Sequence, residues 1–310
     1  MGAVFFVNGF LEAGKTTFIK ELLSREKFAI EGRTLLIVCE EGEVEYDPLL
    51  LSRTKTDIVY MDEEADFNAE NLTRLEAKHN PDRIIIEFNG LWNRKAVEFP
   101  WYWTNMTEIA VFDATTFKLY SDNLRSFLAE QVRNAVIVLF NRCDDLREEL
   151  AGYSRNIKAI NRGACFIFNA SYGNIVLDPD ETLPYDINAD ELFLDDEGFA
   201  VFCIDAVERC EMYIGKTVHF LARAYALKSG SDEAFVAGRY IMTCCEADMT
   251  FAGITCNYTG SASIPNKTWV SVSGDVCINF DEELGTNVPV LKVTALSEAA
   301  PAENEFITLI

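Results

Sequence analysis

The chain is short of positive charge and of long apolar runs. Its 310 residues carry 27 Lys and Arg against 50 Asp and Glu, a formal net charge of −23 at pH 7. An acidic excess of this size repels nucleic acid and anionic membrane surfaces, which excludes both as expected partners and favours cations or basic proteins. No apolar run approaches the roughly 20 residues that cross a bilayer, so we expect no membrane span.

The cysteines lack the spacing of a disulfide framework. There are nine, an odd number in a chain of this size, which favours a reducing compartment. The N-terminal MGAVFFVNGF is apolar but has neither the basic flank nor the cleavage site of a secretory signal. We therefore expect a cytoplasmic protein.

Short apolar runs alternate with amphipathic segments over residues 1–177. The runs are AVFFVN, TLLIVC, DIVY, RIIIEF, EIAVFD, AVIVLF and ACFIF, and the helical segments are 16–28, 68–79, 115–133 and 145–159. Continuous apolar strands that alternate with helices are typical of a parallel sheet covered on both faces. We therefore predict an α/β domain here.

The sequence pattern changes after residue 177. Residues 178–198 are acidic, contain two prolines and have no clean periodicity, which indicates a linker. Short strand-like runs follow: FAVFCI, KTVHFLARAY, FVAGRYIMT, GITCN, TWVSVSG, DVCINF and VPVLKVT. Only 205–213 has a helical pattern there. We predict a small, mostly antiparallel β barrel over residues 199–310.

A candidate phosphate-binding loop follows the first apolar run. GFLEAGKTT, residues 9–17, fits the Walker A pattern G-x-x-x-x-G-K-[ST], in which backbone N–H groups converge on phosphate oxygens at a helix N-terminus. Lys15 would neutralise the outer phosphates and the Thr16 hydroxyl would bind Mg²⁺. The alternative is a glycine-containing turn with a surface lysine. The expected nucleotide contacts are Gly9, Glu12, Ala13, Gly14, Lys15, Thr16 and Thr17.

Two further polar groups follow buried strands. Glu87 ends the RIIIEF run and precedes Gly90, which suits a Walker B strand that anchors Mg²⁺, although Glu87 could simply end its strand in solvent. Asn141, Arg142 and Asp144 follow AVIVLF, where GTPases carry Asn-Lys-x-Asp. A carboxylate there accepts two hydrogen bonds from guanine, whereas adenine presents the opposite pattern, so Asp144 favours GTP. Arg142 replaces the usual lysine, and its stem can still pack over a base.

These motifs make the first half similar to the CobW-like branch of the P-loop GTPases, relatives of the urease and hydrogenase maturation GTPases. The similarity covers about residues 1–175 and rests on GFLEAGKTT, CEEGEVEYD, IIIEFNG, VFDATTF and NRCDD. It implies a P-loop NTPase sheet, slow Mg-dependent GTP hydrolysis and delivery of a metal or metallocofactor. The implied catalytic residues are Lys15, Glu40 and Glu43, and the implied magnesium ligands are Thr16, Asp47 and Glu87.

The chain departs from this family pattern in two places. Glu12 replaces a loop glycine and brings a carboxylate near the phosphates, which predicts weaker nucleotide binding. The family's Cys-x-Cys-Cys metal motif is replaced by DEEADFNAEN, which has no cysteine, so capture of a soft metal by thiolates is not expected there. Its carboxylates either bind a harder ion or form a solvated acidic loop: Asp62, Glu63, Glu64 and Asp66.

The second half has its own resemblance. GRYIMTCCEADMTFAGI, TWVSVSGDV and VPVLKVT are similar to the soluble C-terminal domain of the YcgQ-like, permease-associated proteins, over about residues 195–310. The resemblance implies a permease partner and a role near metal homeostasis. Cys244 and Cys245 are expected either to hold a transition metal such as Zn²⁺ or Co²⁺, or to be buried as small hydrophobes. Adjacent strand residues face opposite ways, so both thiols reach one ion only if the strand has ended.

Two functions follow from these observations. The leading hypothesis is a cytosolic GTPase that works as a switch or metallochaperone, with a metal-related permease or a metalloprotein as its client. The alternative is a non-catalytic scaffold that binds nucleotide and docks a permease or other protein through its β domain. Glu12 and the missing cysteine motif favour the scaffold, whereas the switch-like CEEGEVEYD segment favours the GTPase.

Overall fold

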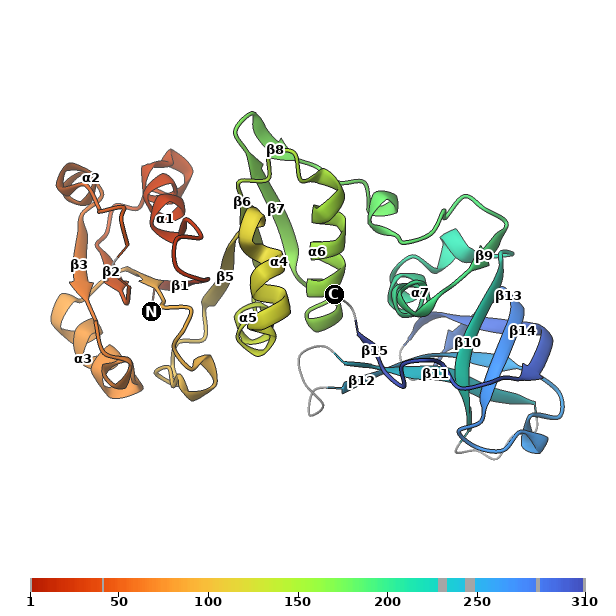
Figure 1. Ribbon diagram of the computed structural model, residues 1–310. Coiled ribbons are helices and arrows are strands. Elements are labelled where there is room, and N and C mark those ends of the chain that lie inside the picture. Colours follow the sequence, from red (N-terminus) through yellow and green to blue (C-terminus); the bar gives the residue numbers. More distant parts are fainter. Residues whose placement is uncertain (1, 41, 228–232, 243–248, 283–284, 309–310) are drawn as a thin grey trace. The chain divides into compact units, whose positions relative to one another are not determined.

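The chain forms two compact units that divide between residues 176 and 177. The computed structural model describes residues 2–40, 42–227, 233–242, 249–282 and 285–308 (Figure 1). Each unit is built around one sheet. Within the described residues, every helix is too short or too polar to cross a membrane.

The first unit contains a predominantly parallel sheet. Its strands are β1 (Ala3–Asn8), β2 (Thr34–Val38), β3 (Thr56–Tyr60), β4 (Arg83–Glu87), β5 (Met106–Asp113), β6 (Ile137–Asn141), β7 (Cys165–Ala170) and β8 (Gly173–Ile175). They lie in the order β3-β2-β4-β1-β5-β6-β7-β8, and only the short β8 runs antiparallel to its neighbour among the described strands. The predicted parallel α/β fold is confirmed.

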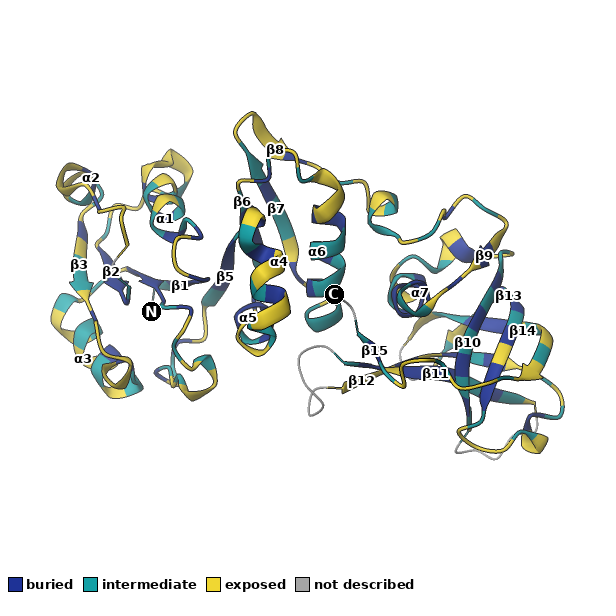
Figure 2. Ribbon diagram, viewed as in Figure 1, coloured by how far each residue is buried: buried dark blue, intermediate teal, exposed yellow. Residues whose placement is uncertain are grey.

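Helices cover both faces of this sheet. They are α1 (Lys15–Ser24), α2 (Pro48–Arg53), α3 (Ala69–His79), α4 (Ala114–Asn123), α5 (Arg125–Val132) and α6 (Arg147–Ile160). Successive residues of β1 face opposite ways, so Val7 packs with Ile19 of α1 and Leu50 of α2, whereas Phe6 packs with Leu72 of α3. Figure 2 shows the consequence: the central strands are mostly buried and the helices are buried along one side.

Two of the predicted helices are shorter than their sequence pattern. The segment 115–133 is two helices, because Leu124 between α4 and α5 leaves the helical conformation at φ −125° and ψ 38°. No glycine or proline marks this break, so the pattern gives no sign of it. The segment 16–28 ends its α-helix at Ser24, where Arg25 is extended.

The second unit is a closed β barrel. Its strands are β9 (Glu191–Phe193), β10 (Thr217–Ala226), β11 (Ala234–Met242), β12 (Met249–Asn257), β13 (Trp269–Asp281), β14 (Thr286–Glu298) and β15 (Ile307–Thr308). The order is β15-β11-β12-β14-β13-β10-β9, and an additional β10–β11 pairing closes a ring of β10, β11, β12, β14 and β13. The ring is antiparallel except between β12 and β14, as in the five-stranded barrel of the OB-fold. The predicted small β domain is confirmed.

One predicted strand of the second half is wrong. The FAVFCI run lies in a helix, α7 (Asp196–Glu208), which begins where the Asp195 carboxylate accepts a hydrogen bond from the Gly198 amide at 2.7 Å. The helix is buried against the barrel, with the rings of Phe199 and Phe220 at 4.7 Å. A continuous apolar run does not distinguish a buried strand from a buried helix, and only the aspartate before it marks the helix start.

Residues 178–198, where the sequence predicts a linker, belong to the second unit in the structure. Strand β9 pairs in parallel with β10, and Leu192 and Leu194 are buried. The Asp180 carboxylate accepts a hydrogen bond from the Arg209 guanidinium at 2.6 Å. The acidic segment is therefore attached to the barrel by both backbone and side-chain contacts.

Candidate nucleotide site

The Walker A loop joins the end of β1 to the start of α1. Gly9 and Gly14 have φ values of 141° and 97°, which favour glycine. A Cβ atom on Gly9 would lie 2.0 Å from the Val111 carbonyl oxygen, and one on Gly14 would lie 2.6 Å from the Asn141 amide nitrogen. The two glycines of the motif are thus required by backbone conformation and by close packing.

Lys15 lies inside the curve of this loop. Its ammonium donates hydrogen bonds to the carbonyl oxygens of Gly9 at 2.7 Å and Phe10 at 2.9 Å. It also forms an ion pair with the Glu40 carboxylate, and the lysine is only 3% exposed. Lys15 is therefore not a surface lysine, and the Glu40 carboxylate is the group that pairs with its charge.

Glu87 lies at the end of β4 in contact with the loop. The Thr16 hydroxyl donates to one carboxylate oxygen at 2.6 Å, and the Tyr46 hydroxyl donates to the other at 2.5 Å. Burial raises the pKa of Glu87, and these two hydrogen bonds act in the opposite direction. A hydroxyl and a carboxylate at this distance form the oxygen-rich pair that Mg²⁺ prefers, so both residues fit a magnesium site.

Tyr46 is a site residue that the motif analysis misses. It is buried, and its hydrogen bond fixes the Glu87 carboxylate. An aromatic residue among the carboxylates of the EVEYD segment is the one sequence sign of this contact.

A cavity of about 130 Å³ lies beside the Walker A loop. Its charged lining comes from four segments distant in sequence, which the parallel sheet brings to one edge. The lining carboxylates are Glu12, Glu40, Glu43 and Glu87, and the lining cations are Lys15 and Arg142. The cavity is therefore more acidic than a site for a polyphosphate alone should be.

Asp47, an expected magnesium ligand, does not line this cavity. Its carboxylate accepts a hydrogen bond from the Leu49 amide at 2.9 Å and caps α2. It lines a separate groove between α1 and α2 together with Lys20 and Arg53. The structure therefore does not bring Asp47 into the cavity with Glu87.

Asn141 and Arg142 contact the Walker A loop. The Asn141 side chain donates to the carbonyl oxygen of Ala13 at 2.8 Å. Arg142 donates to the carbonyl oxygen of Glu12 at 3.1 Å and forms an ion pair with Asp113, which ends β5. The end of β6 and the residue after it therefore hold the phosphate loop through hydrogen bonds to its carbonyl oxygens.

Asp144 is held by the segment that follows the next strand. One of its oxygens accepts hydrogen bonds from the Ser171 amide at 3.0 Å and from the Ser171 hydroxyl. These bonds lower the pKa of Asp144, so the carboxylate is ionised at neutral pH. Asn169 completes the arrangement by donating to the Asn141 side-chain oxygen at 3.1 Å. Sequence analysis misses Asn169 and Ser171, although they follow the ACFIF strand as Asn141 and Asp144 follow AVIVLF.

The expected transition-metal ligands, Cys244 and Cys245, lie outside the described residues. Among residues that the structure describes, no group of three or more His, Cys, Asp or Glu side chains has the arrangement of a metal site. In the acidic loop, Glu64 instead accepts a hydrogen bond from the Asn93 amide at 2.7 Å.

The geometry defines a P-loop nucleotide-binding protein. The Walker A lysine is buried, Thr16 and Glu87 are hydrogen-bonded beside it, and the Asp144 carboxylate lies just after β6, where Ser171 holds it. Residues 3–168 match the family model of the CobW/HypB/UreG nucleotide-binding domain, and residues 178–308 match that of the DUF1980 C-terminal domain. The chain belongs to the CobW/HypB/UreG family. No curated protein matches it.

Several solved structures are similar at low identity. The Zn(II)-bound YjiA GTPase from E. coli is 17% identical, with 94% of this chain and 89% of that chain covered and a TM-score of 0.40. Hydrogenase maturation factor HypB from Archaeoglobus fulgidus is 16% identical (55% and 81% covered, TM-score 0.39). HypB from Helicobacter pylori in complex with nickel is 15% identical (58% and 82% covered, TM-score 0.34). The family assignment rests on the family model and not on these similarities.

Glu12, which stands where the family pattern has a loop glycine, is the subject of a first prediction. It has a left-handed φ of 59°, a conformation that costs a non-glycine residue about 1 kcal/mol, and it lines the cavity. Glu12→Gly should raise the free energy of unfolding by about that amount and tighten nucleotide binding several-fold. Denaturant unfolding and titration with a fluorescent nucleotide measure the two effects.

Glu12→Asn is the matched control, because asparagine tolerates the left-handed conformation better than glutamate and carries no charge. If the carboxylate repels phosphate, Asn should reproduce the gain in affinity. Unchanged affinity in both variants would show that the Glu12 side chain points away from the nucleotide.

Proposed function

We propose that the chain is a cytosolic, Mg-dependent GTPase of slow turnover that serves as a switch or metallochaperone in the handling of a metal or metallocofactor. The observation that carries the proposal is the support of the Walker A loop by its own lysine and by two distant segments. Lys15 fills the loop, Glu87 accepts a hydrogen bond from the Thr16 hydroxyl beside it, and Asn141 at the end of β6 donates to the Ala13 carbonyl oxygen. Membership of the CobW/HypB/UreG family supports the metal-related role.

Magnesium fits the proposal on chemical grounds. Thr16 and Glu87 would hold the ion, which would neutralise charge on the phosphates. Four carboxylates and two cations line the cavity, so a nucleotide should enter far more readily as its Mg²⁺ complex than as the free polyanion. Nucleotide affinity should therefore fall strongly when EDTA removes Mg²⁺.

In the proposed reaction, water attacks the γ-phosphorus while its bond to the β,γ-bridging oxygen breaks, giving GDP and inorganic phosphate. Lys15 stabilises the charge that develops on the phosphoryl oxygens. Glu43 lines the cavity and is exposed, so it is positioned to orient the attacking water. Guanine would be selected by the ionised Asp144 carboxylate: one of its oxygens accepts both hydrogen bonds from Ser171, and the other would accept from the base.

A non-catalytic scaffold is the second candidate, and the Lys15–Glu40 ion pair favours it. An ammonium already neutralised by a carboxylate attracts phosphate less strongly than a free one. The scaffold would bind nucleotide weakly and dock a metal-related permease or a metalloprotein through its DUF1980-type barrel.

Multiple-turnover phosphate release separates the two candidates. The full chain is assayed with Mg-GTP and Mg-ATP, alone and with Zn²⁺, Co²⁺ or Ni²⁺, and Lys15→Ala serves as the inactive control. The GTPase predicts more than one phosphate per chain from GTP, a lower rate from ATP and none from Lys15→Ala. Less than one turnover, at the same level in the variant, favours the scaffold.

The metal role has a separate test. If Cys244 and Cys245 hold a cargo ion, their double replacement by serine should abolish near-stoichiometric metal binding, and the metal should change the GTP turnover of the unmodified chain. Elemental analysis and the turnover assay read these out. GTP turnover by a chain that binds no metal would support the GTPase activity and contradict the metallochaperone role.

Glu40→Gln tests the carboxylate that occupies the phosphate-facing side of Lys15. Because glutamine keeps the shape and removes the competing charge, nucleotide affinity in EDTA should rise about 10-fold, which corresponds to about 1.4 kcal/mol. Titration with fluorescent GDP measures it. Glu43→Gln is the matched control, since it removes one charge from the same cavity without touching the Lys15 ion pair. Equal gains in the two variants would mean that net charge alone sets the affinity.

A further inference from the structure

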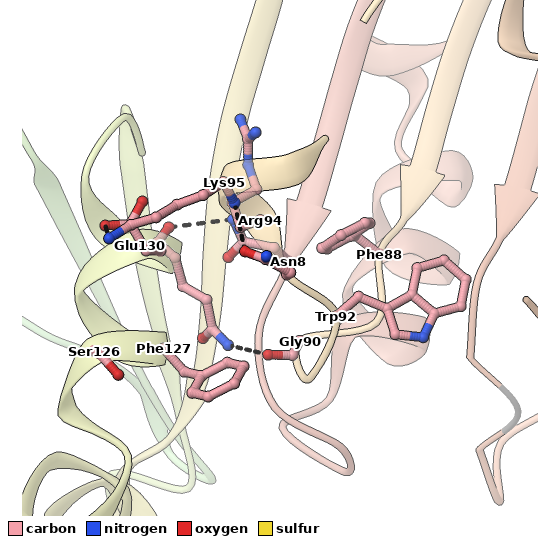
Figure 3. A pocket seen from close by; sticks show the side chains of 11 residues that line it. Asn8, Phe88, Gly90, Trp92, Arg94, Lys95, Ser126, Phe127 and Glu130 are labelled. Atoms are coloured by element: carbon pink, nitrogen blue, oxygen red, sulfur yellow. Dashed lines mark hydrogen bonds and ion pairs between the residues drawn. The ribbon is translucent and has the colours of Figure 1, made fainter. Parts of the chain in front are cut away.

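A second cavity of about 120 Å³ lies beside the end of β1, and it shares no lining residue with the Walker A cavity. Segment 88–95, which follows β4, forms one wall, and α5 forms the other (Figure 3). Aromatic side chains line both walls: Phe88 and Trp92 on the first, and Phe127 on the second. The cavity therefore offers flat apolar surfaces to an occupant.

Two buried acceptor groups of this cavity lack a hydrogen-bond donor. Asn8 and Gln131 are 0% and 3% exposed, and the side-chain oxygens of both have no partner among the residues that the structure describes. The orientation of each amide is set by its nitrogen: Asn8 donates to the Gln131 carbonyl oxygen at 3.2 Å, and Gln131 donates to the Gly90 carbonyl oxygen at 2.9 Å. Flipping either amide would replace a hydrogen bond by contact between two oxygens. Buried acceptors fixed in this way call for a donor.

The cations of the cavity are already paired and do not supply that donor. Arg94 binds the Glu108 carboxylate at 2.6 Å, and Lys95 lies 3.4 Å from a carboxylate oxygen of Glu130. The buried Nε–H of Arg94 also has no partner among the described residues, so the cavity lacks N–H or O–H donors for two oxygens and an acceptor for one N–H. A cavity of about 150 Å³ accommodates benzene, so this smaller one has room for about four to six non-hydrogen atoms.

We infer that this cavity is a binding site for a small planar molecule that carries N–H donors, of the amide or amidine class. The aromatic side chains contact its faces, and the Asn8 and Gln131 oxygens accept its hydrogen bonds. The inference does not rest on the nucleotide function proposed above, because none of the lining residues belongs to the Walker A cavity.

The site is also mechanically connected to the phosphate loop. Asn8 directly precedes Gly9, and a Cβ atom on Gly90 would lie 2.2 Å from the Gly9 carbonyl oxygen. An occupant that holds Asn8 and Gln131 therefore restrains both the loop and the segment after β4. If the chain binds GTP as proposed, any change that the occupant makes in nucleotide affinity is matched by the same factor in the occupant's own affinity.

Three molecules of equal size test the site: acetamidinium, acetamide and acetate. Each has four non-hydrogen atoms and a methyl group that reports binding in saturation-transfer NMR, but they differ in hydrogen bonding, from donors only to acceptors only. Ligands this small bind weakly, with dissociation constants expected on the order of 1 mM. The nucleotide-free full chain should transfer saturation to acetamidinium and acetamide and not to acetate.

Ser126→Trp closes the site without disturbing its buried hydrogen bonds, because Ser126 is exposed on α5 and lines the cavity. Lys118→Trp adds the same indole to an exposed position of α4 that does not line it. Ser126→Trp should abolish the acetamide signal, and Lys118→Trp should preserve it. Gln131→Met, which removes one acceptor at similar volume, should weaken acetamide binding at least 5-fold.

Acetamide is the deciding probe, since a chain of net charge −23 attracts acetamidinium to many places. Three results would each overturn the inference: equal signals from acetamide and acetate, no acetamide signal, or an acetamide signal that survives Ser126→Trp. Any of them would mean that the cavity holds only water. These measurements need no nucleotide, so their failure is distinct from a failure of GTP binding. Fluorescent GDP titrated with and without acetamide then measures the coupling.

Discussion

Lys15→Ala is expected to abolish nucleotide binding while the protein stays folded. The Lys15 ammonium is the one cation inside the curve of the Walker A loop in the described structure, and both loop carbonyl contacts hold it there. Its removal leaves four lining carboxylates against Arg142 alone. Affinity for Mg-GTP should fall at least ~100-fold, which is about 2.7 kcal/mol.

Folding should survive this change because the apolar contacts of α1 lie elsewhere. Ile19 and Leu23 form the buried side of the helix, and Glu40 can turn toward the cavity when it loses its partner. Circular dichroism and thermal unfolding check the fold, and isothermal titration with Mg-GTP measures the affinity. Lys20→Ala is the matched control on the same helix, since Lys20 binds the Glu45 carbonyl oxygen and lies outside the cavity. Tight GTP binding by Lys15→Ala would refute the phosphate-loop interpretation.

The parts of the fold that sequence predicts are those with strong local signals. The β1 and β4 strands are buried on both faces, so their sequences are continuous apolar runs with clear ends. Parallel strands place their carboxyl ends at one edge, and this is why the motifs after β1, β4 and β6 meet although they are far apart in the chain. Sheet topology and motif order together therefore predict where a site forms.

The parts that sequence does not predict depend on contacts between distant segments. Tyr46 fixes Glu87, and Ser171 fixes Asp144, but neither residue belongs to a motif that can be read alone. The six-residue α2 is too short for a periodic pattern, and its start is marked only by the Asp47 cap and the proline that follows. The glutamate at position 12 becomes interpretable only once its left-handed backbone is known.

Asp144→Asn is expected to change the base preference of the nucleotide site. The ionised carboxylate accepts hydrogen bonds, and Ser171 holds one of its oxygens through both its amide and its hydroxyl. Guanine presents two N–H donors to such an acceptor, whereas an asparagine side chain would place its own N–H₂ group against one of them. Affinity for GTP should fall on the order of 100-fold, and affinity for the xanthine nucleotide, which carries a carbonyl there, should rise.

The measurement is competition of GTP, XTP and ATP against a fluorescent guanine nucleotide, in the unmodified chain and in each variant. Asp145→Asn is the matched control: it removes the same charge from the neighbouring residue, and its left-handed φ of 58° suits asparagine equally well. Ser171→Ala should weaken GTP binding less than Asp144→Asn and should leave XTP unimproved, because it loosens the carboxylate without replacing it. Equal affinity of the unmodified chain for ATP and GTP would remove guanine recognition from Asp144. A loss of GTP binding in Asp144→Asn with no gain for XTP would show that the residue supports the loop through Ser171 rather than reading the base.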